Sequence, residues 1–234
     1  MGGLVKLLTF FIYNILMADD YETRVDMRLG GVKEEIANRL NPFNQLSSPF
    51  QQRMIIGTYT LAIEPNFIQW MRIAKSYVKS SEAVNALSIN LQDEINQDHR
   101  KMLRDFAQGC GFNPGFENYS LCFERAMPPV LRMWEMFAKG IGIRNLAAIT
   151  ILEYVSPVFI PYLEEMGKRL GCTDFTYTKI HGEADIEHSM SMRDSLMAEI
   201  AYWRNNKMGN PIASGDVDRA IDTTSAFLTK ILTP

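Results

Sequence analysis

The chain has 234 residues, of which 47% are hydrophobic and 22% charged, with a formal net charge of −3. This composition excludes a disordered or fibrous protein, and the weak negative charge gives no electrostatic reason to expect a nucleic-acid partner. The three cysteines (Cys110, Cys122 and Cys172) are far apart and form no CxxC pair, which excludes a disulfide framework and a zinc knuckle and is typical of a reduced, cytoplasmic protein.

The N-terminus predicts an apolar extension over residues 1–19, ahead of a main domain over 20–234. Residues 4–17 are strongly apolar but too short to cross a bilayer, and no small-residue cleavage site follows them. We therefore expect a docking helix, or an upstream extension before a natural start at Met17, and no membrane partner.

The remaining segments have the hydrophobic periodicity of helices, and none alternates as a strand would. Pro65 lies inside one long apolar segment, where it predicts a kink. We expect a single all-α domain, a bundle of about seven helices over residues 20–40, 49–78, 81–108, 117–139, 144–170, 176–206 and, from 214 or 216, to 232.

One segment carries three candidate metal ligands at helical spacing. His181, Asp185 and His188 stand at positions i, i+4 and i+7, so they share one face of a helix and can converge on a metal from one rigid element. The alternative is a solvated polar face, which would also accommodate Glu183 and Glu187. The spacing by itself favours neither interpretation.

Two other helices each contain a single acid in an apolar run. Glu153 is the only acid between Arg144 and Glu164, and Glu64 is the only one between Arg53 and Arg72. A buried carboxylate costs several kcal/mol unless it is paired or bound to a metal. The alternative is a buried salt bridge, but no pattern of lysines or arginines supplies a partner. A metal site is therefore the better interpretation.

The helix expected over 81–108 adds Glu94 and His99, the only histidine outside the 181–188 segment. Their i+5 spacing puts them about 140° apart on a regular helix. Either the helix has a π-bulge, or it opens before His99. Asp98, at i+4 from Glu94, is a competing ligand.

The complete set has three imidazoles and four carboxylates from four helices. Seven ligands are too many for one zinc ion and suit two metal ions bridged by carboxylates, with iron or manganese favoured by the mixed nitrogen and oxygen donors. A ferritin-like bundle fits poorly, because its two Glu-x-x-His motifs are absent. The sequence identifies no catalytic residue beyond the metal ligands, and we assign no residue to the binding of a further cofactor. The predicted ligands are Glu64, Glu94, His99, Glu153, His181, Asp185 and His188.

The order and spacing of these residues resemble those of the haem-oxygenase-like di-iron oxidases and oxygenases over about residues 45–232. The motifs that carry the resemblance are H-x3-D-x2-H at 181–188, the preceding core Glu153, Asn90-Leu91-x-x-Glu94 with His99, and Gly57-x6-Glu64. The resemblance implies a haem-oxygenase-like (TenA/PqqC-like) bundle that binds two iron ions (Fe2+/Fe3+) through the seven predicted ligands and uses O2 as co-substrate.

The resemblance also implies an activity. We expect an O2-dependent non-haem di-iron oxidase or oxygenase that acts on a small carboxylate-bearing substrate in a biosynthetic pathway. Family members oxidise amino acids, by C–C or C–N cleavage or by conversion of a tryptophan side chain to a nitrile, and also fatty acids. An amino acid, including an aromatic one, is our first expectation. The alternatives are a fatty-acid decarboxylase and a non-catalytic metal-binding interaction protein. We expect a cytoplasmic homodimer, and an external electron donor is compatible with this chemistry.

Other activities on this fold lack their residues here. A haem oxygenase needs an early proximal histidine, and none precedes His99. A thiaminase-type enzyme needs a cysteine within about residues 146–150, which contain none. The branch that makes para-aminobenzoate from its own tyrosine needs a lysine at the position of Leu163.

Aromatic residues near the predicted ligands are candidates for a substrate cavity. The alternative for each of them is an ordinary place in the core. They are Tyr59, Phe67, Trp70, Tyr154 and Phe159.

Overall fold

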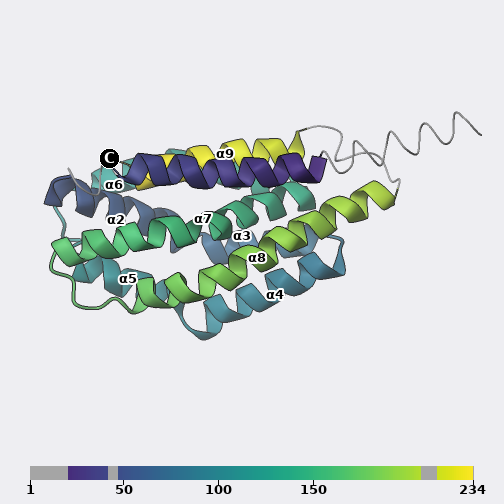
Figure 1. Ribbon diagram of the computed structural model, residues 1–234. Coiled ribbons are helices and arrows are strands. Elements are labelled where there is room, and N and C mark those ends of the chain that lie inside the picture. Colours follow the sequence, from purple (N-terminus) through teal and green to yellow (C-terminus); the bar gives the residue numbers. More distant parts are fainter. Residues whose placement is uncertain (1–20, 42–46, 207–214, 234) are drawn as a thin grey trace, which may run out of the picture.

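A computed structural model describes residues 21–41, 47–206 and 215–233 (Figure 1). These ranges contain α-helices joined by turns and loops, with no β-strand, as expected for an all-α protein. The predicted apolar extension at 1–19 lies outside the described residues. An N-terminal helix is described over 21–41 and is followed by α2 (Pro49–Ile63), α3 (Phe67–Tyr77), α4 (Ser81–Asn96), α5 (His99–Gly109), α6 (Tyr119–Phe137), α7 (Gly142–Arg169), α8 (Thr176–Asn205) and α9 (Asp216–Leu232).

The described part of the chain has nine helices, so the expectation of about seven was wrong. The segment expected as one helix over 49–78 is two, because Pro65 has no N–H to continue the hydrogen-bond ladder, and a turn separates α2 from α3. The segment expected over 81–108 is also two, because Asp98 adopts a left-handed conformation (φ 51°, ψ 47°) between α4 and α5. The prolines inside α6 and α7, by contrast, do not end those helices.

Local sequence explains where several helices begin. The Ser48 side chain accepts a hydrogen bond from the backbone N–H of Gln51, the Gln51 side chain accepts one from the backbone of Ser48, and Pro49 occupies the first turn. This reciprocal arrangement is a capping box. Ser80 caps α4 through a single bond, in which its side chain accepts a hydrogen bond from the backbone N–H of Ala83.

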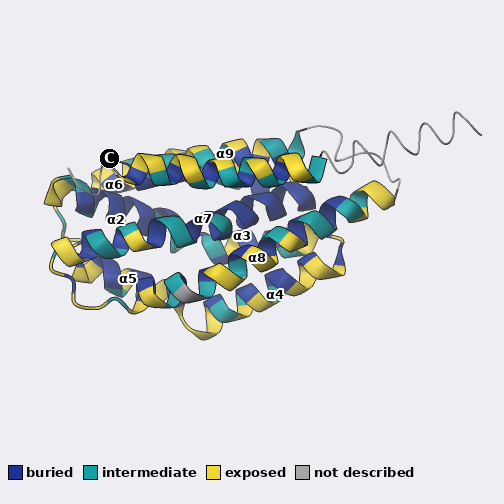
Figure 2. Cartoon of the chain, in the orientation of Figure 1, coloured by how far each residue is buried: buried dark blue, intermediate teal, exposed yellow. Residues whose placement is uncertain are grey.

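Helix α7 is the central element of the bundle. It packs against α8, α9 and α3, while α2 packs on α6 and α4 on α8. Gly142 allows α7 to begin close to the end of α3, since a Cβ there would lie 2.3 Å from the carbonyl oxygen of Tyr77. Figure 2 shows that α7 is buried over most of its surface, whereas the outer helices alternate buried and exposed faces.

The apolar character of α7 reflects this position. Among the described helices, α7 is long and apolar enough to cross a membrane by length and composition, but 72% of its most apolar stretch is buried inside the bundle. This burial is typical of the core helix of a soluble protein.

The N-terminal helix lies beside α9 (Figure 1). Five of its apolar residues recur at helical spacing and are buried. On its polar side, Arg28 forms ion pairs with Asp218 and Asp222 of α9. Both kinds of contact attach the N-terminal helix to the bundle. The buried residues of this stripe are Val25, Leu29, Val32, Ile36 and Leu40.

Candidate metal centre

Six of the seven predicted ligands come together in the interior of the bundle. They form two groups of three, and within each group the potential ligand atoms all lie within 4.8 Å of one another. The first group is Glu94, His99 and His181, and the second is Glu153, Asp185 and His188. The six residues come from α4, α5, α7 and α8.

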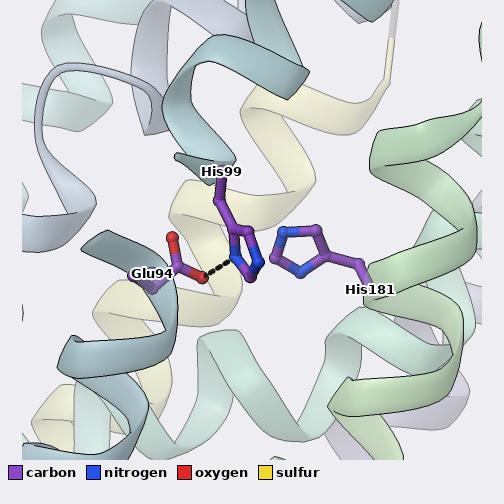
Figure 3. A group of neighbouring side chains, drawn as sticks. All are labelled: Glu94, His99 and His181. Carbon is purple, nitrogen blue, oxygen red and sulfur yellow. Dashed lines mark hydrogen bonds and ion pairs between the residues drawn. The ribbon is translucent and has the colours of Figure 1, made fainter. Parts of the chain in front are cut away.

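The first group joins side chains from three helices (Figure 3). Nδ1 of His99 lies 2.9 Å from Oε1 of Glu94, and the ring centroids of His99 and His181 are 4.5 Å apart. All three residues are buried. Figure 3 shows the two imidazoles next to each other, with the carboxylate of Glu94 beside His99.

The break between α4 and α5 brings His99 into this group. Of the two alternatives that the i+5 spacing leaves open, the structure shows a helix that opens before His99. Asp98 is exposed, and its side chain accepts a hydrogen bond from the backbone N–H of Lys101, so it caps α5. Asp98 therefore has a structural role in directing His99 inward and lies outside both groups.

The second group lies between α7 and α8. Nδ1 of His188 is 3.9 Å from Oε2 of Glu153, and Asn90 donates a hydrogen bond of 2.9 Å to the other oxygen of Glu153. On the opposite side of the His188 ring, Nε2 lies 3.4 Å from Oδ2 of Asp93. Side chains of α4 thus orient both members of the pair.

The two groups touch through α8. His181 and Asp185 are one helical turn apart, and Nδ1 of His181 lies 3.1 Å from Oδ1 of Asp185. The predicted face of α8 therefore points into the bundle, and the solvated polar face is not what the structure shows for these three residues: His181 and Asp185 are buried, and the His188 side chain is 13% exposed.

Burial and mutual repulsion dominate the electrostatics. Burial raises the pKa of Glu153 well above its ordinary value, and the nearby carboxylates of Asp185 and Glu94 raise it further, against the hydrogen bond from Asn90. For His181, burial lowers the pKa, but the carboxylates of Asp185 and Glu94 outweigh it and the net pKa is raised. The centre thus concentrates negative charge that a cation would relieve.

Two buried atoms indicate where a cation would bind. Within the described part of the chain, Nε2 of His181 and Oδ2 of Asp185 are buried and have no hydrogen-bond partner. A buried acceptor without a partner is costly, so such atoms call for a ligand or an ion. Imidazole nitrogens and carboxylate oxygens suit iron and manganese. The residues present therefore fit a metal centre of this kind.

Glu64, the seventh predicted ligand, is placed differently. Its Oε1 accepts hydrogen bonds from Arg100, with Nε at 3.1 Å, and from Arg104. It belongs to neither group of three. Its side chain nevertheless lines the same cavity as the first group.

A cavity adjoins the two groups. Its empty volume, including the part open to solvent, is about 540 Å3, and side chains of both groups line it. Three of the five aromatic candidates line it: Tyr59, Phe67 and Phe159. The other two lie elsewhere. Trp70 is fully buried against Phe137 and Phe227, and Tyr154 lies beneath Lys33. The remaining lining residues are Ile63, Glu64, Ile68, Glu94, His99, Arg100, Leu103, Leu152, Glu153, Ser156, Ile160, Tyr177, His181 and Asp185.

A buried pair of tyrosines lies at the edge of the first group. The hydroxyls of Tyr59 and Tyr177 are 2.7 Å apart, and the Tyr177 ring centroid is 4.4 Å from that of His181. Burial raises the pKa of both phenols, so both are protonated at neutral pH. They close one wall of the cavity.

Sequence reasoning gave no role to four residues that contact the candidate ligands. Asn90 stood there only as part of the Asn90-Leu91-x-x-Glu94 motif, and its spacing of four from Glu94, like that of Tyr177 from His181, puts it on the same helix face as a predicted ligand. Asp93 and Arg100 gave no such signal, and their contacts with His188 and Glu64 cross between helices.

Comparisons with known proteins agree with the geometry. Residues 60–215 match the sequence model of a family described as iron-containing redox enzymes. No curated protein matches the sequence. Among solved structures, the fold is similar to that of a TenA homologue from Pseudomonas syringae pv. tomato, with a TM-score of 0.65 at 13% identity over 90% of each chain. A TenA family transcription regulator from Silicibacter sp. TM1040 gives a TM-score of 0.46 at 11% identity over 92% of this chain and 93% of that one. The first likeness shows the haem-oxygenase-like fold.

Proposed function

The chain belongs to the family of iron-containing redox enzymes, and on that premise we propose that it is an O2-dependent di-iron oxidase or oxygenase of a small carboxylate-bearing molecule. The observation that supports this most directly is the pair of touching groups, each with one carboxylate or two, and each with at least one imidazole. Two adjacent groups suit two ions better than one, because the three ligand atoms within each group already lie within 4.8 Å of one another, and a single tetrahedral zinc would use only four of the six ligands.

The residues that would hold the ions are those of the two groups. Glu94, His99 and His181 would hold one, and Glu153, Asp185 and His188 the other. Two iron ions, when bound, would supply the electrons that reduce O2 and the oxidising power that acts on the substrate.

Residues around the groups would set the ligand positions. Asn90 holds the carboxylate of Glu153 and Asp93 lies against the far nitrogen of His188, and such outer hydrogen bonds fix the orientation of ligating side chains. Tyr59 and Tyr177 keep each other's hydroxyl satisfied, so they can form an apolar wall without an unpaired polar atom.

The cavity would hold the substrate beside the first group. Ile63, Phe67, Leu152 and Phe159 line it with apolar surface, which excludes water from the reacting centre. An apolar chamber of this kind suits an amino acid with an apolar or aromatic side chain. A fatty acid is the second candidate, and the same lining supports it.

Three further expectations stay predictions. They are a homodimer, an external electron donor and a cytoplasmic location.

Metal content tests the proposal. After anaerobic loading with ferrous iron and gel filtration, we expect about two irons per chain and an optical change on exposure to O2. Glu153→Ala combined with His188→Ala removes two ligands of the second group and should bind no more than about one iron per chain. The matched control is Glu164→Ala, which removes an acid from the same helix, α7, where it pairs with Lys168, and it should keep the wild-type content.

Two results would contradict the proposal. One is tight binding of zinc with no binding of ferrous iron, which would favour a metal-binding interaction protein. The other is an unchanged iron content in the double variant. A separate measurement distinguishes the two substrate candidates. If iron binds as expected, amino acids or fatty acids should accelerate O2 consumption, and the class that does so is the substrate class.

A further inference from the structure

Three charged residues meet at the exposed edge of the cavity. Glu64, at the end of α2, accepts hydrogen bonds from Arg100 and Arg104 of α5. Glu64 and Arg100 line the cavity. The two arginine side chains are 43% and 45% exposed, whereas Glu64 is 16% exposed. At this edge one carboxylate therefore lies between two guanidinium groups. The negatively charged Glu64 and the positively charged Arg100 both border the cavity beside the first group.

The two oxygens of Glu64 are not equivalent. Both arginines contact Oε1, with Nη2 of Arg100 at 3.0 Å and Nε at 3.1 Å. None of the hydrogen bonds found among the described residues uses Oε2. Glu64 thus has a second oxygen available while Arg104 holds the first.

We propose that Arg100 and Glu64 form the subsite for the head group of an α-amino acid substrate, an inference that rests on the proposed function of the cavity. The substrate carboxylate binds the Arg100 guanidinium, which presents paired donors suited to a carboxylate. The substrate ammonium binds Oε2 of Glu64. Arg104 keeps Oε1 and so holds Glu64 in place.

The charges at this edge favour a zwitterion over a simple acid. A simple acid competes with Glu64 for Arg100 and leaves the Glu64 carboxylate with Arg104 as its one basic partner. An α-amino acid replaces the Arg100–Glu64 contact with two new ion pairs and leaves the net charge of the edge unchanged. Each charged group then has a partner of opposite sign.

The rest of the lining defines the side chain of the substrate. Beyond Arg100 and Glu64, the wall contains Ile63, Phe67, Leu103 and Phe159. These residues suit an apolar or aromatic side chain and offer no partner to a second charge. The substrate class is therefore an apolar or aromatic amino acid.

This assignment gives Glu64 a role other than that of a seventh metal ligand. The resemblance implies a ligand at this position, but its side chain lies outside both groups and is engaged by two arginines. As a substrate-binding residue, Glu64 can be replaced without loss of iron.

Calorimetric titration tests the subsite with defined probes. The probes are L-phenylalanine and L-leucine, each compared with the acid that lacks the amino group, 3-phenylpropionate and 4-methylpentanoate. The wild-type protein should bind at least one of the amino acids about 10-fold more tightly than its acid. Arg100→Gln should weaken binding of that amino acid by about 10-fold or more, and so should Glu64→Gln.

The same variants contain their own controls. Glu64→Gln should leave binding of the matching acid unchanged or tighter, because the competing carboxylate has gone. Lys101→Gln removes a positive charge from the neighbouring position on α5, where Lys101 pairs with Asp105, and it should change affinity by less than about 2-fold. Iron content per chain should equal that of the wild type in all three variants.

Each contrary result has a definite meaning. If both acids bind at least as tightly as their amino acids and Glu64→Gln tightens them further, the ligand is a simple acid and the zwitterion subsite is wrong. If Glu64→Gln loses iron, Glu64 is a metal ligand and the assignment is also wrong. Failure of the wild type to bind iron, with amino-acid binding intact, would instead refute the di-iron proposal and leave the subsite standing.

Discussion

The two halves of α8 each bury a carboxylate, and the two carboxylates differ in how they are satisfied. In the C-terminal half, Glu199 is fully buried and accepts hydrogen bonds from the backbone N–H groups of Lys79 and Ser80, at 2.7–3.0 Å, and from the Trp203 indole at 2.9 Å. In the N-terminal half, Asp185 is 1% exposed, and its Oδ2 has no partner among the described residues.

Complete hydrogen bonding marks Glu199 as a structural acid. It accepts hydrogen bonds from backbone N–H groups just before α4 and so fixes that end of α4 against α8. Asp185, whose surroundings are a histidine and other acids, has no such set of donors. Burial alone therefore does not identify a metal ligand, whereas burial with unused acceptor atoms does.

The largest expected difference between the halves is in metal binding. Asp185→Asn should lower iron affinity by about 100-fold, so that less than two irons per chain survive gel filtration, because a neutral amide is a poor ligand for iron. Glu199→Gln should retain the wild-type iron content. Equal loss of iron in both variants, measured by elemental analysis on folded protein, would erase the distinction.

The next largest effect concerns the stability of the metal-free protein. Here the Glu199 variant should be affected more than the Asp185 variant. Glu199→Gln should lower the free energy of unfolding by about 2–4 kcal/mol, because an amide replaces a carboxylate that accepts several hydrogen bonds. Urea denaturation of metal-free protein measures this. Glu165→Gln, at an exposed pair with Arg169, is the matched control and should change stability by less than about 1 kcal/mol.

A smaller effect, this time a gain in stability, is expected from a substitution at the metal centre itself. The pKa of Glu153 in the folded protein is raised, so its folded form retains a proton that the unfolded chain has lost, and stability falls as the pH rises from about 4.5 towards the folded pKa. Glu153→Gln removes this titration and keeps an oxygen for Asn90. The metal-free variant should be about 1–2 kcal/mol more stable than wild type at pH 7.

This gain depends on pH and on metal. Urea denaturation at pH 4.5 should show little difference between Glu153→Gln and wild type. With iron bound, the order should reverse, since the variant lacks a ligand. A variant that is less stable at pH 7 without metal would show that Glu153 is satisfied in the way that Glu199 is.

The smallest effect should come from a polar residue in the N-terminal half that does have a partner. Tyr177→Phe removes the hydrogen bond between Tyr177 and Tyr59 and should lower stability by about 1 kcal/mol. Its iron content should stay unchanged. A loss of iron would show that the tyrosine pair supports the ligands directly.

Much of the fold and of the site follows from local pattern. Hydrophobic periodicity predicted the helices, and the single acid in the most apolar stretch of α7, Glu153, predicted a buried carboxylate. The expected number of helices was wrong because a new helix begins after Pro65 and another after Asp98. The direction that each new helix takes depends on its packing against the rest of the bundle. Asp98 in particular adopts a left-handed conformation that is uncommon for residues other than glycine.

The amino-acid sequence by itself determined which side chains share a face of α8, because helical geometry places residues 181, 185 and 188 in one stripe whatever surrounds them. The tertiary structure alone decided which side chains from other helices meet that stripe. Glu153 and His99 reach it, whereas Glu64 is engaged by arginines 36 and 40 residues later in the chain. Contacts between helices depend on packing angles and on where each helix breaks, and the spacing of residues within one helix contains neither.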